Sequence, residues 1–149
     1  MRFFILTLLL ISQSAGAAIR ANPQGISYEA SATAATTTTS GTNSVMSGMT
    51  ITPTAGNYLV LFSGWCTHNS NGDTITISIF NNGSQVTASI RTILPRITSS
   101  FGTPAASDMA VMTNGVVTAT GSGAVTIDWS TTGATATCTN RTLDLIRLK

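Results

Sequence analysis

Apolar and polar residues alternate one by one along several segments of this 149-residue chain. Thr74–Phe80 (TITISIF) has an isoleucine at every second position, and Ala124–Ser130 (AVTIDWS) has Val, Ile and Trp at every second position. Successive side chains of a β-strand point to opposite faces, so these segments predict strands with one buried and one solvated face. No segment of useful length has a helical period, and Gly, Pro and Asn recur at short intervals. The pattern predicts an all-β sandwich or barrel.

Expected turns separate the expected strands. Asn81-Asn82-Gly83 is the best hairpin signal, because Asn-Gly accepts the positive φ angles of tight hairpin turns, and Asn114-Gly115 and Pro53–Gly56 also predict turns. Leu94–Ser107 is the longest expected loop. The expected strands are Ile26–Glu29, Ala32–Thr38, Met49–Thr52, Tyr58–Trp65, Thr74–Phe80, Gln85–Ile93, Asp108–Met112, Val116–Thr120, Ala124–Ser130, Ala134–Cys138 and Thr142–Leu148.

Residues 1–17 have the three-part layout of a secretory signal peptide. Met1-Arg2 makes a basic start, Phe3–Ile11 (FFILTLLLI) is a short apolar run, and Ala15-Gly16-Ala17 matches a small-x-small cleavage site. The run is shorter than the roughly 20 apolar residues that span a bilayer. We therefore expect an extracellular mature chain, cleaved after Ala17 and without a membrane span. If the run is retained, it would be a buried strand or an anchor within an assembly.

The low charge of the chain excludes several classes of function. Asp, Glu, Lys and Arg make up only 8% of the residues, against about 25% in ordinary soluble domains. Seven basic and five acidic residues give a net charge of +2. This is too little positive charge for an electrostatic nucleic-acid binder. An apolar content of 42% also excludes the charged type of disordered chain.

Few residues are available for acid–base chemistry. His68, the only histidine, lies near Asp73 and Cys66 in the sequence, and such pairs can form part of a nucleophilic site. The chain has no G-x-S-x-G motif, however, and a histidine in a polar loop is most often simply solvated. A metal site built from His68 and Asp73 would need further ligands. We expect a protein that is not an enzyme, with no catalytic residue, no metal site and no cofactor.

Two strands are apolar on both faces. Tyr58–Phe62 (YLVLF) has no polar face, and Leu143–Leu148 (LDLIRL) nearly lacks one. In a chain with so little charge, these strands favour a sheet with its core on one side and a partner subunit on the other. The alternative is a strand at the centre of a thick core.

These strands also carry a resemblance to a known family. Pro53–Ser63 (PTAGNYLVLFS) resembles the P-x-x-G-x-Y-x-x-x-F strand of the tumour-necrosis-factor-like jelly roll, a family that includes the globular head of complement's first component. Ser78–Val86 (SIFNNGSQV) resembles the hairpin that follows, Val116–Trp129 is similar to the next two strands, and Thr142–Leu148 takes the place of the closing strand. The resemblance covers residues 47–149, after N-terminal strands in 18–46. Small Thr/Ser-rich versions look like modules on phage particles and bacterial secreted proteins.

The resemblance implies a ten-strand antiparallel jelly-roll sandwich that forms a trimer about the sheet holding the two-sided strands. The chain lacks the acidic calcium-site cluster of the animal members, so their cofactors and receptors do not carry over. The trimer interface would then include Tyr58, Val60, Phe62, Leu143 and Leu145.

The same topology would place Cys66 beside Cys138, because their strands would be antiparallel neighbours. An exported protein would usually pair the two cysteines as a disulfide. In a protein made and assembled in a cytosol, they would instead remain two buried free thiols.

Three side chains are candidates for ligand binding. Trp65 lies at a strand end and could stack on a sugar, whereas Trp129 shares the apolar face of its strand and is expected in the core. Arg91 and Arg96 flank Ile93-Leu94-Pro95; they could hold an acidic group of a partner, or they are solvated or paired with the few Asp residues.

The expected function is that of a non-enzymatic, trimeric surface or structural protein. It would be a virion component, either a decoration or a fibre head, or the exposed head of a bacterial appendage. Its partners would be copies of itself, with other virion or surface proteins or a host-surface glycan as further possibilities. The alternative is a secreted carbohydrate-binding module that uses Trp65 and the Leu94–Ser107 loop.

Overall fold

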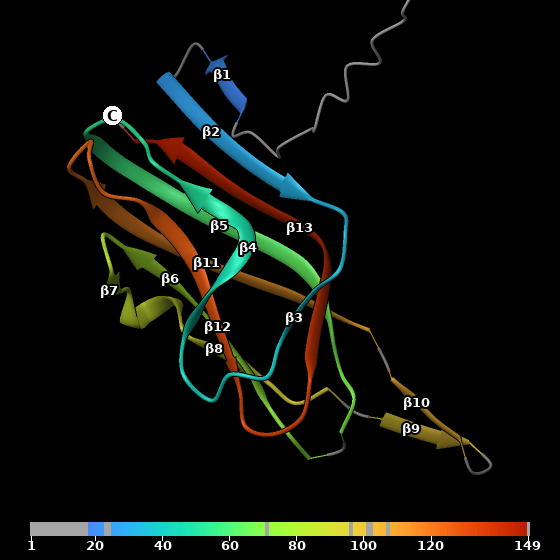
Figure 1. Ribbon diagram of the computed structural model, residues 1–149. Helices are drawn as coiled ribbons and strands as arrows, with labels where there is room; N and C mark the ends of the chain where they lie inside the picture. The colour runs from blue at the N-terminus through green and yellow to red at the C-terminus, as the bar shows by residue number, and fades with distance from the viewer. Residues whose placement is uncertain are drawn as a thin grey trace, which may run out of the picture.

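The computed structural model describes residues 18–22, 25–70, 72–95, 97–100, 103–106 and 108–148. Most of these residues form two antiparallel sheets that face each other as a sandwich (Figure 1), and two further strands form a separate hairpin. Apart from one 3₁₀ turn, η1 (Thr87–Ser89), the described part of the chain is strands, turns and loops. No helix in it has the length and apolar character to cross a membrane. The expected signal peptide and Arg96 lie outside the described residues.

The strands of the two sheets are interleaved along the chain. Along the chain, strands of one sheet alternate with strands of the other from β4 to β6 and again from β11 to β13, which confirms the expected all-β antiparallel sandwich. The first sheet has the order β1 (Ala18–Asn22), β2 (Gly25–Ala32), β13 (Ala136–Arg147), β5 (Gly56–His68) and β11 (Met109–Ala119), with β3 (Thr36–Thr38) also paired to β13. The second sheet has the order β4 (Ser44–Ile51), β12 (Val125–Thr131), β6 (Ile75–Asn81) and β7 (Ser84–Gln85), with β8 (Arg91–Ile93) also paired to β6.

The core lies between the two sheets and follows the expected alternation. On β6, Ile75, Ile77 and Ile79 are fully buried, and on β12 the ring of Trp129 is buried with Ile127. Thr76, Ser78, Thr126 and Ser130 point to the other face, where Ser78 is covered, whereas Thr131 at the end of β12 is buried on the core side. Burial of the apolar face is the main favourable term for such a sandwich, at roughly 25 cal/mol per Å² of apolar surface. Trp129 is therefore part of the core, as expected.

Some expected boundaries are wrong. Asn114-Gly115 is not a turn but lies within β11, which pairs with β5 along its whole length. The expected strands Ala134–Cys138 and Thr142–Leu148 are parts of one strand, β13, with a register shift between Thr139 and Thr142. The expected strand Gln85–Ile93 is divided into β7, η1 and β8. The hairpin at Asn82-Gly83 is confirmed, with φ angles of 50° and 76°.

The expected Leu94–Ser107 loop contains a hairpin of its own. β9 (Ile97–Ser100) and β10 (Thr103–Ala106) pair only with each other among the described strands. Figure 1 shows this hairpin projecting from one end of the sandwich.

Candidate interaction surface

The five residues expected at a trimer interface point into the core. Tyr58, Val60, Phe62, Leu143 and Leu145 are at most 1% exposed in a single chain and belong to the cluster between the sheets. This assignment was wrong, because their own second sheet already covers them. On a strand that is apolar on both faces, a neighbouring subunit would contact the intervening residues, which point the other way.

The opposite face of the same sheet carries apolar side chains that the described chain leaves uncovered or half-covered. Strand register places Leu59 between Ile146 on β13 and Val116 on β11. Val116 is 60% exposed and Met112 is 73% exposed, whereas Leu59, Leu61 and Ile146 are half-buried. We call these five residues, Leu59, Leu61, Met112, Val116 and Ile146, the outer apolar face.

A small hollow lies on this face, where β5, β11 and β13 run side by side. Its volume is about 190 Å³, which is below the 300–1,000 Å³ that is typical of small-molecule sites. A hollow of this size suits one or two side chains of a partner better than a whole ligand. Its lining residues are Leu61, Phe62, Ser63, Met112, Thr113, Asn114 and Asp144.

Trp65 and Arg91, two of the predicted ligand-binding residues, lie on different sheets. Trp65 is 47% exposed near the end of β5, and its cross-strand neighbours are the small residues Ala110 and Thr139. Arg91 lies on β8 and is exposed; its Nη1 donates to the main-chain carbonyls of Ala88 at 3.1 Å and Ile90 at 2.8 Å. The guanidinium of Arg91 is thus already hydrogen-bonded to nearby main-chain carbonyls of the same chain.

His68 is buried and both of its ring nitrogens have partners. Nδ1 lies 3.0 Å from the Ser70 N–H and 3.2 Å from the Ser70 carbonyl, and Nε2 shares a hydrogen bond of 2.7 Å with the Thr131 hydroxyl. The ring therefore ties β5 to β12 instead of lying in a solvated loop. Both ring nitrogens are therefore occupied by groups of the same chain.

Asp73 lies in the loop beyond His68. A hydrogen bond from the Ser70 side chain, helped by the Ala134 N–H, holds the pKa of the Asp73 carboxyl below its ordinary value. Asp73 is half-buried. The described part of the chain holds no group of three or more His, Cys, Asp or Glu side chains that could bind a metal ion.

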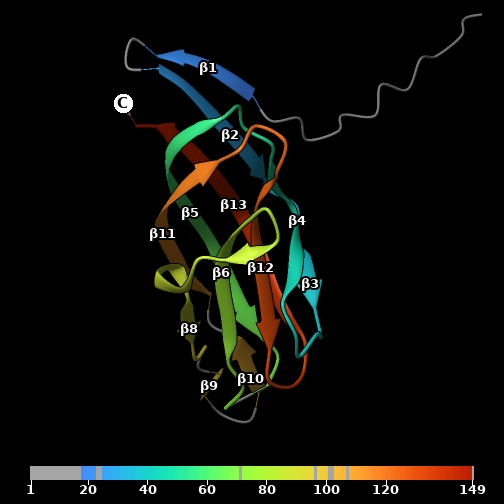
Figure 2. The same ribbon diagram turned by 90° about the vertical axis from the view of Figure 1, so that its left-hand side faces the viewer.

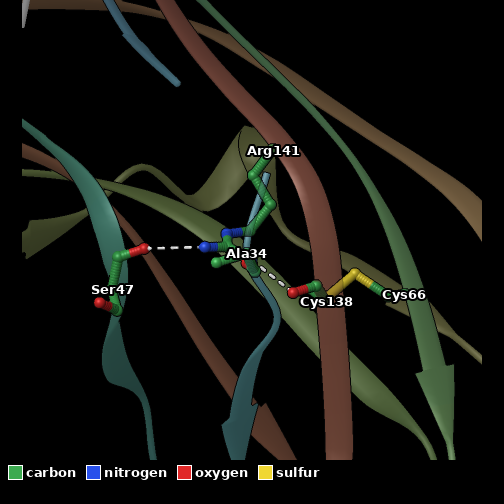
Figure 3. Close-up of a disulfide and its surroundings, with 5 residues drawn as sticks. All are labelled: Ala34, Ser47, Cys66, Cys138 and Arg141. Carbon is green, nitrogen blue, oxygen red and sulfur yellow. Dashed lines mark hydrogen bonds between the residues drawn. A yellow bond between two sulfur atoms is a disulfide. The ribbon is translucent and has the colours of Figure 1, made fainter. Parts of the chain in front are cut away.

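Cys66 and Cys138 form a disulfide between β5 and β13 (Figure 3). The two residues are direct cross-strand partners with a Cα–Cα distance of 4.1 Å. Such a short separation is typical of antiparallel pairs whose main chains do not hydrogen-bond to each other. The disulfide therefore links two central strands of the first sheet.

Beside the disulfide lies a buried arginine that the sequence analysis did not single out. Arg141 is 3% exposed, and its guanidinium donates to the carbonyls of Ala34 at 2.8 Å, Ser47 at 3.4 Å and Cys138 (Figure 3). Burial lowers its pKa. Arg141 thus connects β13 to the segment before β3 and to β4 of the second sheet.

Gly64 makes room for this arginine. A Cβ at Gly64 would lie 3.2 Å from Arg141 Cγ and 3.3 Å from Phe62 Cζ, closer than ordinary packing allows. The signal in the sequence was the isolated glycine within a strand, which often marks a close approach of another group.

Comparison with known proteins finds matches among the solved structures. No family model matches the chain, and no curated protein sequence is similar to it. The C-terminal domain of EclA, described as a sugar-binding protein, aligns with a TM-score of 0.44 and 13% sequence identity, covering 74% of this chain and 77% of that one.

Proposed function

We propose that this chain is a non-enzymatic structural or attachment protein that acts as a homotrimer, with the outer apolar face buried between subunits. The observation that supports this is the exposure of Met112 and Val116 beside Leu59, Leu61 and Ile146 on one sheet face. Contiguous exposed apolar patches on soluble domains often mark interaction sites. Covering each such side chain contributes on the order of 1–2 kcal/mol.

The strand order supports a tumour-necrosis-factor-like arrangement. β5 and β13 are antiparallel neighbours in one sheet, which is the pairing that the resemblance of Pro53–Ser63 and of the closing strand implies. That family assembles about the sheet that carries the two-sided strands. In this chain the residues available to a neighbour are the outer ones, such as Leu59 and Ile146.

The protein would work outside the cell, as a decoration or fibre head of a virion or as the head of a bacterial appendage. Its partners would be its own copies and other surface proteins of the same particle or appendage. A trimer presents three identical ends to a repeated partner, and this multivalency raises avidity without strong single contacts. The Thr-, Ser- and Asn-rich solvated faces suit such a role because they need few charges.

Replacing Leu59 with lysine tests the trimer. In Leu59→Lys, three ammonium groups would be desolvated together at the interface, which is strongly unfavourable. We expect the wild type to scatter light as a trimer at micromolar concentration and Leu59→Lys to scatter as a monomer.

The matched control is Val45→Lys. Val45 is 53% exposed but lies on β4 of the second sheet, so this variant should remain a trimer. Unfolding midpoints of both variants show whether they fold. A monomeric wild type, or a folded Leu59→Lys that stays trimeric, contradicts the proposal.

The exposed indole of Trp65 supports a second candidate, a carbohydrate-binding surface. An open aromatic ring near threonine hydroxyls provides stacking area and hydrogen-bonding groups for a sugar. Trp129 is buried, so fluorescence quenching by an added oligosaccharide would report on Trp65. Binding that is absent from a glycan array, or that persists in Trp65→Ala, would exclude this candidate.

A further inference from the structure

The free edge of β11 lacks the usual protection of an edge strand. β11 lies at the margin of the first sheet and, among the described strands, pairs only with β5 (Figure 2). It is 11 residues long, MAVMTNGVVTA, with no charged residue and no proline. Its register with β5 runs without a shift from Met109 to Ala119. Natural sheets blunt such edges with charges, prolines, bulges or short strands.

The other sheet margins in the described part of the chain do have such protection. β7 and β8 are only 2 and 3 residues long. β4 is interrupted by a register shift against β12 and contains Gly48 at a φ of 78°. β1 is short and carries Arg20 in its sequence. The open edge of β11 is therefore a distinctive feature of this fold.

The hydrogen bonds around Asn57 show which groups of β11 face outward. The Leu148 N–H donates to the Asn57 carbonyl at 2.8 Å, so the main chain of Asn57 faces β13 and away from β11. Its partner Thr118 therefore faces the free edge, where its carbonyl accepts a hydrogen bond from Asn81 Nδ2 at 2.9 Å. By alternation, the other residues with outward N–H and C=O groups are Ala110, Met112, Asn114 and Val116.

We propose that this edge is a docking strand for β11 of a second copy of the chain, antiparallel about a two-fold axis at Asn114. In this register Val116 lies opposite Met112 of the second copy, and Met112 lies opposite Val116. Each directly opposed pair of outward residues exchanges two main-chain hydrogen bonds. The contact is isologous, so the same strand, β11, forms the interface on each of the two copies.

Three features of β11 favour a second copy over another strand. Its two most exposed apolar side chains, Met112 and Val116, are symmetric about Asn114, so only this centre pairs them with each other. The strand carries no charge, whereas a two-fold contact would set any charge near the axis close to its own copy. Asn114 on the axis has both an amide donor and a carbonyl acceptor, which allows two identical side chains to hydrogen-bond.

This contact goes beyond the proposed trimer. A three-fold axis cannot pair β11 with β11, whereas a two-fold axis can. The trimer contact buries side chains of the outer apolar face, and the edge contact joins main chains. Together they would link trimers into a larger assembly, which suits a structural component of a particle.

Residue-resolved amide exchange by NMR on the full chain tests the edge contact. At low concentration, the outward amides of Met112, Asn114 and Val116 should exchange rapidly, whereas those of Thr113 and Val117, bonded to β5, are protected. At high concentration, the outward amides should become protected and the particle mass measured by light scattering should double. Outward amides that exchange equally fast at both concentrations would overturn the proposal.

Two substitutions at the axis sharpen the test. Asn114→Pro removes an outward N–H without removing a bond to β5, and it should abolish the doubling of mass. Asn114→Asp is isosteric and places two carboxylates opposite each other, so it should have the same effect at neutral pH. Asn114→Thr keeps the N–H and should still pair. Doubling that persists in a folded Asn114→Pro and in Asn114→Asp would contradict the edge contact.

The variant Leu59→Lys separates this proposal from the trimer. If the trimer fails, Leu59→Lys and wild type have the same mass, yet the outward amides of β11 still become protected with concentration. If the edge contact fails, wild type is a trimer in which these amides are never protected.

Discussion

The buried Arg141 provides the sharpest test of what holds the two sheets together. Its guanidinium donates to the carbonyls of Ala34, Ser47 and Cys138, which belong to three different segments. The substitution Arg141→Met keeps a long flexible side chain beside Gly64 but removes every donor. We expect the free energy of unfolding to fall, because the three carbonyls lose their donor and the bond to the Cys138 carbonyl lies in the buried interior.

The expected loss follows from the contacts. A buried acceptor without a partner costs about 1–3 kcal/mol. The buried bond to Cys138 should count fully, whereas the bonds to Ala34 and Ser47 are only partly buried, so water can replace part of them. Part of this loss is offset, since the folded protein no longer desolvates a cation whose Nε has no partner among the described residues. The balance is a loss of roughly 1–3 kcal/mol, a substantial part of the usual 5–15 kcal/mol of a domain.

Urea unfolding measures this loss, and Arg91→Met is the matched control. Arg91 also donates to two main-chain carbonyls, those of Ala88 and Ile90, but it is exposed. Water can replace its bonds, so Arg91→Met should stay within about 0.5 kcal/mol of wild type. The denaturant slope should not change in either variant. If Arg141→Met is as stable as wild type, or if Arg91→Met loses as much stability, burial of the Cys138 carbonyl is not the cause of the loss.

Two further predictions concern the same end of the sandwich. Replacing both Cys66 and Cys138 with Ala should lower the free energy of unfolding by about 4 kcal/mol in the chain-entropy model, because the disulfide joins residues 72 positions apart in the sequence. Urea unfolding measures this loss, and a loss below about 1 kcal/mol would contradict that model. The pKa of Asp73 is lowered mainly by the Ser70 hydrogen bond. The ionised carboxylate therefore stabilises the folded protein above the pKa that Asp73 has in the unfolded chain. This stabilisation disappears as the pH falls through the lower pKa of the folded state. Asp73→Asn should therefore weaken the acid dependence of stability, and an NMR titration with an ordinary Asp73 pKa would refute the cause.

Local patterns succeeded where one face of a strand differs from the other. On β6 and β12, alternation between isoleucine or tryptophan and polar residues was enough to predict both the strand and its buried face. The turn at Asn82-Gly83 was also predictable, because its positive φ angles are a property of those two residues. The same dipeptide type at Asn114-Gly115 failed, since continuous pairing of β11 with β5 outweighed the local turn preference.

The sequence predicted which strands carry the candidate surface, but it did not predict which face of their sheet is exposed. On Tyr58–Phe62 every residue is apolar, so a shift of one residue changes which side chains are buried without changing the pattern. Packing of β5 against the second sheet decides that Tyr58, Val60 and Phe62 are core and that Leu59 and Leu61 face outward.

The sequence by itself determined the all-β class, the low charge and the segments that alternate, because these depend on residues close together in the chain. The tertiary structure alone decided which face of β5 is outward, that Arg141 is buried opposite Gly64, and that β11 has an open edge. Each of these depends on strands that lie far apart in the sequence and side by side in space. Their energies belong to pairs of segments, and no single segment of the sequence contains them.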